Sequence, residues 1–288
     1  MTGAVTHVSQ QFAAADGLLL TRQAWRAVEG PTAVLALVHG YGEHGGRYRE
    51  LAVELAGHGL AVHVYDLRGH GLSAGRRGHV KRFTDYLVDT AVYLDAVRID
   101  DPGLPVYLLG HSFGGLIAAA LVEQRTAAGL AALILSAPFL RMALEVPPLR
   151  IQAARVVSVV APTFDIGNTL DAAGLSHDEA VVAAYRTDPL NHHKATARWA
   201  AETLAAQGAA LAAAPRIALP LLVMYGEADA VADPAGAREL FAAAASADKT
   251  ERAYPGYYHE IFNETGRAAV FADLAVWLEE RRLGGGAG

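Results

Sequence analysis

Short apolar runs of strand length alternate with longer amphipathic stretches over most of the chain. Five runs are apolar on both faces and mostly end in a glycine or a polar turn; they cover residues 34–38, 61–65, 106–109, 131–135 and 221–225. Runs of this kind are typical of parallel strands that are buried on both faces. A sixth strand is expected at residues 250–254.

Amphipathic stretches of helix length lie between the expected strands. They cover residues 47–57, 83–97, 114–125, 234–245 and 266–283. This alternation predicts an α/β fold with a mostly parallel central sheet and helices on both of its faces. Segments 8–14 and 18–25, separated by Ala15-Asp16-Gly17, predict an antiparallel hairpin at one edge of the sheet.

The alternation stops between about residue 138 and residue 218. This stretch holds a Pro-Pro pair, the run VVSVVAP, a capping sequence SHDE and alanine-rich helical segments, and strand-type runs resume after it. We therefore expect one helical cap inserted into a single α/β domain. The expected division is 1–139 for the N-terminal part of the core, 140–217 for the cap, 218–283 for the C-terminal part of the core and 284–288 for a flexible tail.

Composition and charge narrow the class of protein. Hydrophobic residues make up 52% of the chain and charged residues 19%, as in a compact globular protein. A net charge of -6 disfavours a nucleic-acid partner, and the absence of cysteine removes disulfides and thiolate zinc sites. The N-terminal MTGAVTHVSQQF lacks the pattern of a secretory signal, and no apolar stretch reaches the roughly 18 residues of a membrane span. We expect a cytoplasmic protein that contacts membranes at most peripherally.

A nucleophile is predicted within VYLLGHSFGGLIAAAL. There Ser112 stands between Gly110 and Gly114 in a G-x-S-x-G pattern, after an expected strand and before an expected helix. The five-residue pattern alone is common, but this strand, turn and helix order is that of a nucleophile elbow. The flanking glycines leave room for the strand and the helix to approach closely. The alternative is a glycine-rich turn that contains an incidental serine.

A serine nucleophile needs a base and an acid that orients the base. In α/β-hydrolases these residues follow the serine in the order acid, then histidine. Asp229 follows the expected strand 221–225, and His259 follows the expected strand 250–254. His259 is also the only histidine after Asp229 in the sequence. The order and the positions at carboxyl ends of strands predict a triad of Ser112, Asp229 and His259.

Competing acids have simpler interpretations. Asp233 directly precedes Pro234 and an expected helix, so a helix N-cap is its expected role. Glu227 is the weaker rival of Asp229 because it lies closer to the end of the strand.

Four other histidines are expected to be structural. The adjacent His192 and His193 in the cap are expected to face solvent or to cap a helix. His63 and His70, near the second buried strand, are expected to be held by hydrogen bonds.

Several motifs together resemble a known family. HGYGEHGGRY, DLRGHGLSAGRRGHV, GHSFGG, AYRTDPL, YGEADAVADPAGA and YYHEIFNE occur in this order. The chain resembles the monoacylglycerol lipases within the α/β-hydrolase fold over nearly its whole length. GHSFGG alone would identify only the fold, whereas HGYGEHGGRY and the GHGLSAG segment are more specific.

The resemblance implies an activity and roles for named residues. It implies a serine hydrolase that cleaves monoacylglycerols to glycerol and fatty acid through an acyl-enzyme, with Ser112, Asp229 and His259 as its catalytic residues. The backbone N–H groups of Tyr41 and Phe113 correspond to the oxyanion hole. The family needs no cofactor or metal, so none is expected here.

The resemblance also implies a site for the glycerol head group. Glu43 and Arg47 match the family's head-group residues, and Tyr185 matches a tyrosine of the cap near the same pocket. This chain departs from the family at Phe262, where the animal enzymes carry a second histidine. That departure bears on recognition of the head group and not on hydrolysis.

Other hypotheses fit parts of the same pattern. A carboxylesterase, a lysophospholipase or a thioesterase would use the same scaffold, and a non-catalytic receptor could share the fold. A zinc hydrolase would use His39, Glu43 and His44, although these lack the spacing of the helical H-E-x-x-H motif. In the interpretation that we favour, the two histidines brace the loop by hydrogen bonds.

The partners follow from these hypotheses. We expect a lipid ester as substrate, no nucleic acid, and a monomer or a homodimer. The cap segment 140–166 is rich in leucine, valine and proline. It either packs on the core or forms an apolar mouth that contacts membranes or lipid aggregates.

Overall fold

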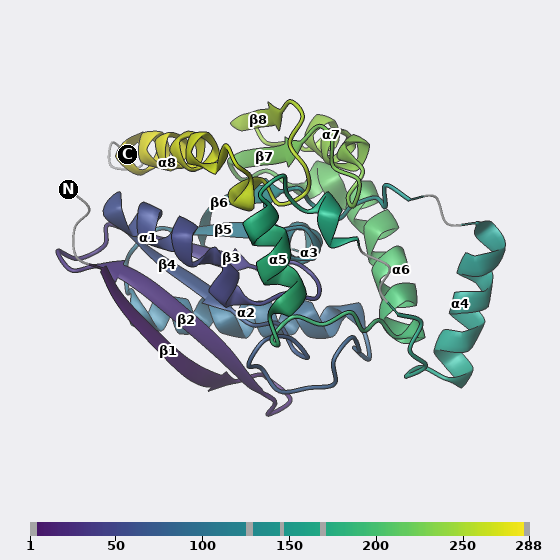
Figure 1. Ribbon diagram of the computed structural model, residues 1–288. Helices are drawn as coiled ribbons and strands as arrows, with labels where there is room; N and C mark the ends of the chain where they lie inside the picture. Colours follow the sequence, from purple (N-terminus) through teal and green to yellow (C-terminus); the bar gives the residue numbers. More distant parts are fainter. Residues whose placement is uncertain (1–4, 125–128, 145–146, 168–170, 285–288) are drawn as a thin grey trace.

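The computed structural model describes residues 5–124, 129–144, 147–167 and 171–284. Its centre is an eight-stranded sheet in the order β1-β2-β4-β3-β5-β6-β7-β8 (Figure 1). The strands are β1 Val5–Ala13, β2 Leu19–Ala27, β3 Ala33–Val38, β4 Leu60–Tyr65, β5 Val106–His111, β6 Leu130–Ser136, β7 Leu221–Gly226 and β8 Lys249–Tyr254. All neighbours from β4 to β8 are parallel, while β2 is antiparallel to both β1 and β4.

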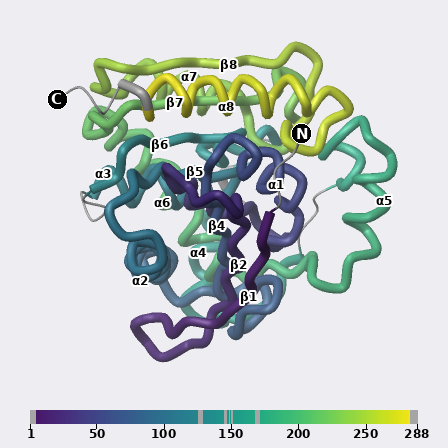
Figure 2. The backbone as a smooth tube through the Cα atoms, turned by 90° about the vertical axis from the view of Figure 1, so that its left-hand side faces the viewer, coloured from purple at the N-terminus to yellow at the C-terminus, as the bar shows by residue number. Residues whose placement is uncertain are grey.

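The sheet confirms the α/β-hydrolase fold expected from the sequence. Every residue of β3, β4, β5 and β7 is buried, as the continuous apolar runs predicted. The predicted N-terminal hairpin forms one edge of the sheet and β8 forms the other, and the two edges lie at the bottom and the top of Figures 1 and 2.

Helices cover both faces of the sheet, as expected. The helices of the core are α1 Arg49–Gly57, α2 Phe83–Asp100, α3 Phe113–Glu123, α7 Pro234–Ala243 and α8 Arg267–Gly284. Because side chains alternate along a strand, Leu35 and Leu37 of β3 pack in one apolar cluster with α1 and α8. Val34 and Val38 pack on the opposite face with α2, α3 and α7.

The insertion between β6 and β7 carries three further α-helices within its described residues. They are α4 Pro148–Val160, α5 Glu179–Thr187 and α6 Ala197–Ala213. Asp178 of the SHDE sequence caps α5, and the Thr196 hydroxyl caps α6. Helix α6 packs against α3 and α4 packs against α6, so α4 lies far from the sheet (Figure 1).

Two further observations concern the expected boundaries. Helix α1 begins at Arg49, and a single 3-10 turn, Gly45–Tyr48, replaces its predicted first residues. Of the predicted tail 284–288, residues 285–288 lie outside the described part of the chain. No helix in the described ranges is long and apolar enough to cross a membrane.

Candidate active site

Ser112 occupies a strained turn between β5 and α3. Its backbone has φ 53° and ψ -117°, a conformation that residues other than glycine rarely adopt. A Cβ atom at Gly110 would lie 2.3 Å from the carbonyl oxygen of Gly114, and one at Gly114 would lie 2.1 Å from that of Val38. Neither glycine can therefore carry a side chain, and the start of α3 is pressed against the end of β3.

A line of hydrogen bonds joins Ser112 to the two partners that the chain order predicted. Ser112 Oγ lies 2.8 Å from His259 Nε2, and His259 Nδ1 lies 2.7 Å from Asp229 Oδ2. Asp229 Oδ1 accepts hydrogen bonds from the backbone N–H groups of Val231 and Ala232 at 2.8 and 2.9 Å. The Asp229 carboxylate is thus fixed by the loop after β7, and all three side chains are buried.

The surroundings of His259 adjust its pKa in opposite directions. Burial opposes protonation, but the Asp229 carboxylate outweighs it, so the pKa of His259 lies above its ordinary value. The ring of His111 lies 5.1 Å from the ring of His259. Burial, together with the nearby charge of His259, lowers the pKa of His111 to about 3, so this neighbour is neutral at physiological pH.

The competing residues occupy other roles. Asp233 caps α7 by accepting the N–H of Ala235 at 2.8 Å, as predicted. His63 and His70 are buried and hydrogen-bonded, to Asp101 and to the carbonyl of Arg68, also as predicted.

The expectation that His192 faces solvent or caps a helix is wrong. Its side chain is 7% exposed, and its backbone N–H donates to the carbonyl of Gly42 at 2.9 Å. The ring of His192 packs edge-on against Tyr41 at 5.4 Å and lies 4.5 Å from the ring of His70. This contact between the insertion and the loop after β3 buries it, whereas the adjacent His193 is exposed.

His39 and His44 brace the loop after β3, as the sequence suggested. The N–H of Leu67 donates to His39 Nε2 at 2.9 Å, so this nitrogen is an acceptor. His44 Nε2 lies 3.0 Å from Asp188 Oδ2, and His44 Nδ1 accepts the N–H of Gly46. Both rings therefore tie the loop to neighbouring segments.

Two backbone N–H groups near Ser112 are free among the described residues. Those of Tyr41 and Phe113 donate to no group in this part of the structure. Phe113 directly follows Ser112, and a Cβ atom at Gly40 would lie 3.2 Å from the Cβ of Ser112. The loop that carries Tyr41 therefore closely approaches the serine.

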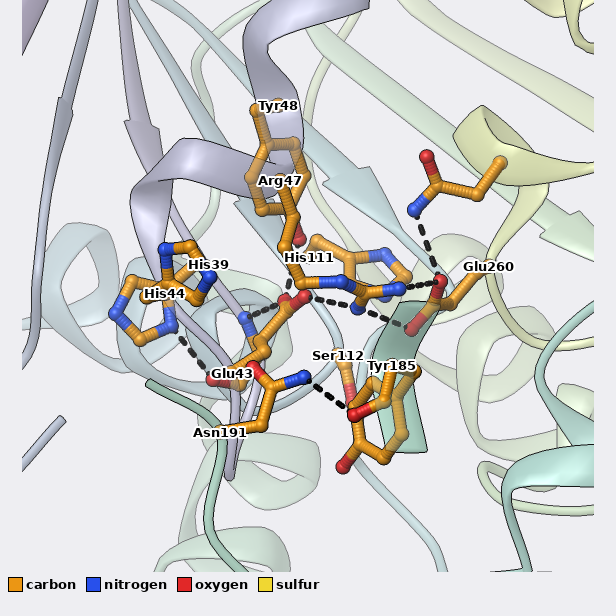
Figure 3. Close-up of polar contacts among 12 residues, drawn as sticks. His39, Glu43, His44, Arg47, Tyr48, His111, Ser112, Tyr185, Asn191 and Glu260 are labelled. Carbon is orange, nitrogen blue, oxygen red and sulfur yellow. Dashed lines mark hydrogen bonds and ion pairs between the residues drawn. The ribbon is translucent and has the colours of Figure 1, made fainter. Parts of the chain in front are cut away.

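Arg47 is held between two carboxylates next to this loop (Figure 3). Its Nη1 donates to Glu43 Oε2 and to Glu260 Oε1, both at 2.6 Å, and its Nη2 donates to Glu260 Oε2 at 2.7 Å. The guanidinium also lies 4.9 Å from the centre of the Tyr185 ring. Burial alone would raise the pKa of Glu43, but Arg47 and nearby groups lower it to about 2, so Glu43 is ionised.

One pocket collects most of these residues. It has an empty volume of about 510 Å³, part of which is open to solvent. Its walls are Gly40, Tyr41, Glu43, His111, Ser112, Phe113, Phe139, Leu175, Tyr185, Trp199, Val231, His259 and Glu260. Glu43 and Glu260 are thus in the wall, and both are paired with the single guanidinium of Arg47.

Sequence reasoning missed two ionisable residues of this wall, Glu260 and His111. Glu260 is 4% exposed and directly follows His259, and its ion pair with Arg47 joins positions far apart in the chain. An acidic residue next to the predicted base was the available signal. His111 lies inside the GHSFGG motif, in which the elbow pattern predicts a role only for Ser112.

Comparisons with known proteins bear on this arrangement. A family model described as serine aminopeptidase, S33, matches residues 29–266. The chain is 35% identical over 274 residues to a monoacylglycerol lipase of Mycolicibacterium smegmatis, a match that covers 95% of this chain and 97% of that protein. The chain belongs to the monoacylglycerol lipase family of α/β-hydrolases. It is therefore a hydrolase of the lipase and esterase class.

Two other proteins are also similar to this chain, one in structure and one in sequence. The crystal structure of a monoacylglycerol lipase of Paleococcus ferrophilus has a TM-score of 0.80 and 29% identity, and covers 96% of this chain and 99% of that one. Phospholipase YtpA of Bacillus subtilis is 34% identical over 257 residues, which are 89% of this chain and 98% of that protein. The names of the similar proteins thus include both monoacylglycerol lipases and a phospholipase.

Phe262 is the position at which the resemblance predicts a departure from the animal monoacylglycerol lipases. It is 3% exposed and lies in the apolar cluster under α8, 6.4 Å from the ring of Phe271. Glu260, which directly follows His259, lines the pocket instead. In this member of the monoacylglycerol lipase family, the carboxylates in the pocket wall are those of Glu43 and Glu260.

Proposed function

We propose that this chain hydrolyses monoacylglycerols to glycerol and fatty acid, with Ser112 as nucleophile, His259 as base and Asp229 as the acid that orients it. The observation that carries the proposal is the line of hydrogen bonds at 2.7 and 2.8 Å, which ends on a serine in the pocket wall. Membership of a family of ester hydrolases supports it.

The chemical steps follow from the atoms in this line. His259 Nε2 accepts the proton of Ser112 as Oγ attacks the ester carbonyl carbon, and the carbonyl oxygen becomes negative. The intermediate collapses, the bond to the glycerol oxygen breaks, and His259 gives its proton to that oxygen. Water then attacks the acyl-enzyme with His259 as base, the fatty acid leaves, and Ser112 regains its proton.

We propose that the N–H groups of Tyr41 and Phe113 bind the negative oxygen. Both are free of other partners among the described residues, and both belong to the pocket wall. In serine hydrolases, the loss of one such donor costs about 2.7–4 kcal/mol of transition-state stabilisation.

We propose that Glu43, Arg47 and Tyr185 form the head-group end of the pocket, together with Glu260. The two carboxylates can accept hydrogen bonds from glycerol hydroxyls, and Arg47 fixes both of them. A phosphate group would lie beside two carboxylates that share one guanidinium, so it would meet an excess of negative charge there. The site therefore favours a neutral polyol ester over a lysophospholipid.

We propose that residues 140–217 form a cap over the pocket. Leu175, Tyr185 and Trp199 come from the insertion and line the pocket together with Phe139 and Val231, which packs against the cluster of Leu175 and Tyr185. An acyl chain between them would gain roughly 0.8 kcal/mol for each buried methylene, so the apolar wall dominates substrate affinity.

We propose that α4 contacts membranes or lipid aggregates. Leu149 and Val160 of this helix are 81% and 76% exposed, and Val156 and Val159 are exposed as well. Replacing Val156, Val159 and Val160 with serine is expected to lower cosedimentation with phosphatidylcholine vesicles without changing the melting temperature. Serine at the exposed Ile99, on α2, is the matched control. Equal vesicle binding by both variants would contradict the proposal.

The proposed activity is tested with a panel of esters. Purified wild type is compared on a long-chain monoacylglycerol, a short p-nitrophenyl ester, acyl-CoA and the lysophosphatidic acid with the same acyl chain. We expect the highest kcat/KM on monoacylglycerol, no turnover by Ser112→Ala, and labelling of wild type by a fluorophosphonate. Ser9→Ala, on the exposed face of β1, is the matched control.

Each alternative gives a different outcome of this panel. A preference for the phosphorylated substrate would refute the argument from the two carboxylates and favour a lysophospholipase. Full activity of Ser112→Ala would remove the proposed nucleophile, and wild type without turnover or labelling would favour a receptor.

A further inference from the structure

The side chain of Tyr41 is held by the insertion. Its ring stacks on the ring of Trp199 in the first turn of α6, with centroids 3.8 Å apart and an angle of 26° between the planes. Its hydroxyl donates to the backbone carbonyl of Lys194 at 2.6 Å. An edge contact with Phe113 at 5.6 Å completes the surroundings on the side of the core.

Backbone hydrogen bonds also join the insertion to loops of the core. The N–H of His192 donates to the carbonyl of Gly42, and that of Thr196 donates to the carbonyl of Gly78, both at 2.9 Å. A Cβ atom at Gly42 would lie 2.7 Å from the carbonyl oxygen of His192. Residues 192–199 of the insertion, which we call the docking segment, therefore fit closely against the loop that carries Tyr41.

The two proposed oxyanion donors are supported in different ways. Phe113 is fully buried in the core at the start of α3, so its N–H is fixed by the same packing that strains Ser112. Tyr41 lies three residues beyond the end of β3, in a loop. On its N-terminal side this loop is tied by the N–H of Gly40, which donates to Glu43 Oε1 at 2.6 Å. Beside the hydrogen bond from His192 to the carbonyl of Gly42, the side chain of Tyr41 supplies a further tie, and both lead to the insertion.

We propose that the phenol side chain of Tyr41 is a positioning group for its own backbone N–H, and that the docking segment completes the oxyanion hole by holding this side chain. This inference rests on the proposed function. It makes the position of the insertion a determinant of the chemical step as well as of substrate fit. Trp199 and the Lys194 carbonyl act through Tyr41 and need not touch the reacting atoms.

Two variants separate the parts of this support. Tyr41→Phe removes the hydrogen bond to Lys194 and keeps both the stacking and the N–H. Tyr41→Leu removes the stacking as well and still keeps the N–H. Tyr254→Phe is the matched control, because its hydroxyl donates to Asp273 between β8 and α8 and Tyr254 does not line the pocket.

The measurement compares two inhibitors with the same alkyl chain. An alkylboronic acid forms a tetrahedral adduct with Ser112 and needs the oxyanion donors, whereas a 1-O-alkylglycerol ether fills the pocket without reacting. We expect Tyr41→Phe to lower kcat and boronic acid affinity by about 3- to 10-fold, and Tyr41→Leu by more. The upper limit is the roughly 10²- to 10³-fold loss seen when a whole donor is removed. Ether affinity and KM should change less than threefold in Tyr41→Phe.

The outcomes distinguish positioning from mere packing. Equal losses of boronic acid and ether affinity in both variants would show a simple pocket defect and overturn the inference. Unchanged kcat and boronic acid affinity in both variants would also overturn it. Melting temperatures identify a variant that fails to fold, and Tyr41→Phe keeps the ring packing if Tyr41→Leu does not fold. A wild type that hydrolyses no ester would instead refute the proposed function.

Discussion

Asp229→Asn tests the proposed triad more sharply than loss of the side chain does. Asp229 Oδ1 accepts two backbone N–H groups, at 2.8 and 2.9 Å, while Oδ2 faces His259 Nδ1 at 2.7 Å. An asparagine must keep its oxygen toward the two N–H donors, because its NH₂ group would otherwise meet them. The NH₂ group then faces His259 Nδ1 and forces that nitrogen to be an acceptor.

The consequence is a histidine in the wrong tautomer. With Nδ1 as acceptor, Nε2 carries the proton and points it at Ser112 Oγ, so His259 cannot act as a base. The same change in another serine hydrolase lowers kcat about 10⁴-fold, which corresponds to about 5 kcal/mol of activation free energy. We expect a loss of this order for Asp229→Asn. In Asp229→Ala no NH₂ group faces Nδ1, so His259 can adopt either tautomer and we expect a smaller loss.

The assay is kcat/KM on a monoacylglycerol between pH 5 and 9. The hydrolytic base must be neutral, and Asp229 raises the pKa of His259, so the acidic limb of the wild-type profile lies above the ordinary pKa of histidine. Without the carboxylate this limb moves to lower pH in Asp229→Ala. A variant Asp229→Asn that keeps more than a tenth of wild-type activity, or loses less than Asp229→Ala, would refute the reasoning.

Two further predictions concern stability. Glu43→Gln is expected to lower the free energy of unfolding at pH 7 by less than the roughly 3–5 kcal/mol of a buried charge left alone, because Glu260 still pairs with Arg47. The pKa of Glu43 is lowered to about 2 in the folded protein from an ordinary 4.5. In urea unfolding curves, the difference in unfolding free energy between wild type and Glu43→Gln should therefore shrink as pH falls from 4.5 to 2. A difference that stays constant over this range would contradict the ionised state of Glu43. Gly114→Ala is expected to prevent folding or activity, because its Cβ would lie 2.1 Å from a carbonyl oxygen. A Cβ at Gly208 in α6 would meet nothing within 4 Å, so Gly208→Ala should raise the free energy of unfolding by up to about 1 kcal/mol, measured by thermal unfolding. The opposite ranking of these two variants would show that the elbow has room for a methyl group at residue 114.

Local patterns predicted most of the fold and the candidate triad. Buried parallel strands read as continuous apolar runs, so β3, β4 and β5 were found to within two residues of their ends. Ser112, Asp229 and His259 were predicted because chain order and strand ends restrict the choice to few residues. Apolar runs, chain order and strand ends are all properties of the sequence itself, so they predict these elements without knowledge of tertiary contacts.

Contacts between distant segments escaped this reasoning. His192 lies in the polar stretch NHHK, which predicts exposure, yet its partners are Gly42 and Tyr41 in the loop after β3. Glu260 gave no signal of pairing with Arg47, because that pair forms only when β8 takes its place in the sheet. In both cases the decisive interaction comes from tertiary packing, which overrides local propensity.

The position of the insertion in the chain has a consequence for biosynthesis. Ser112, Tyr41 and the docking segment precede β7, whereas the loops that carry Asp229 and His259 follow β7 and β8. A ribosome therefore adds the elbow and most of the pocket wall before it adds Val231, His259 and Glu260, the last three residues of that wall. Until β8 joins the edge of the sheet, the hydroxyl of Ser112 has no group to take its proton. The proposed triad is thus complete only after the last strand has joined the sheet.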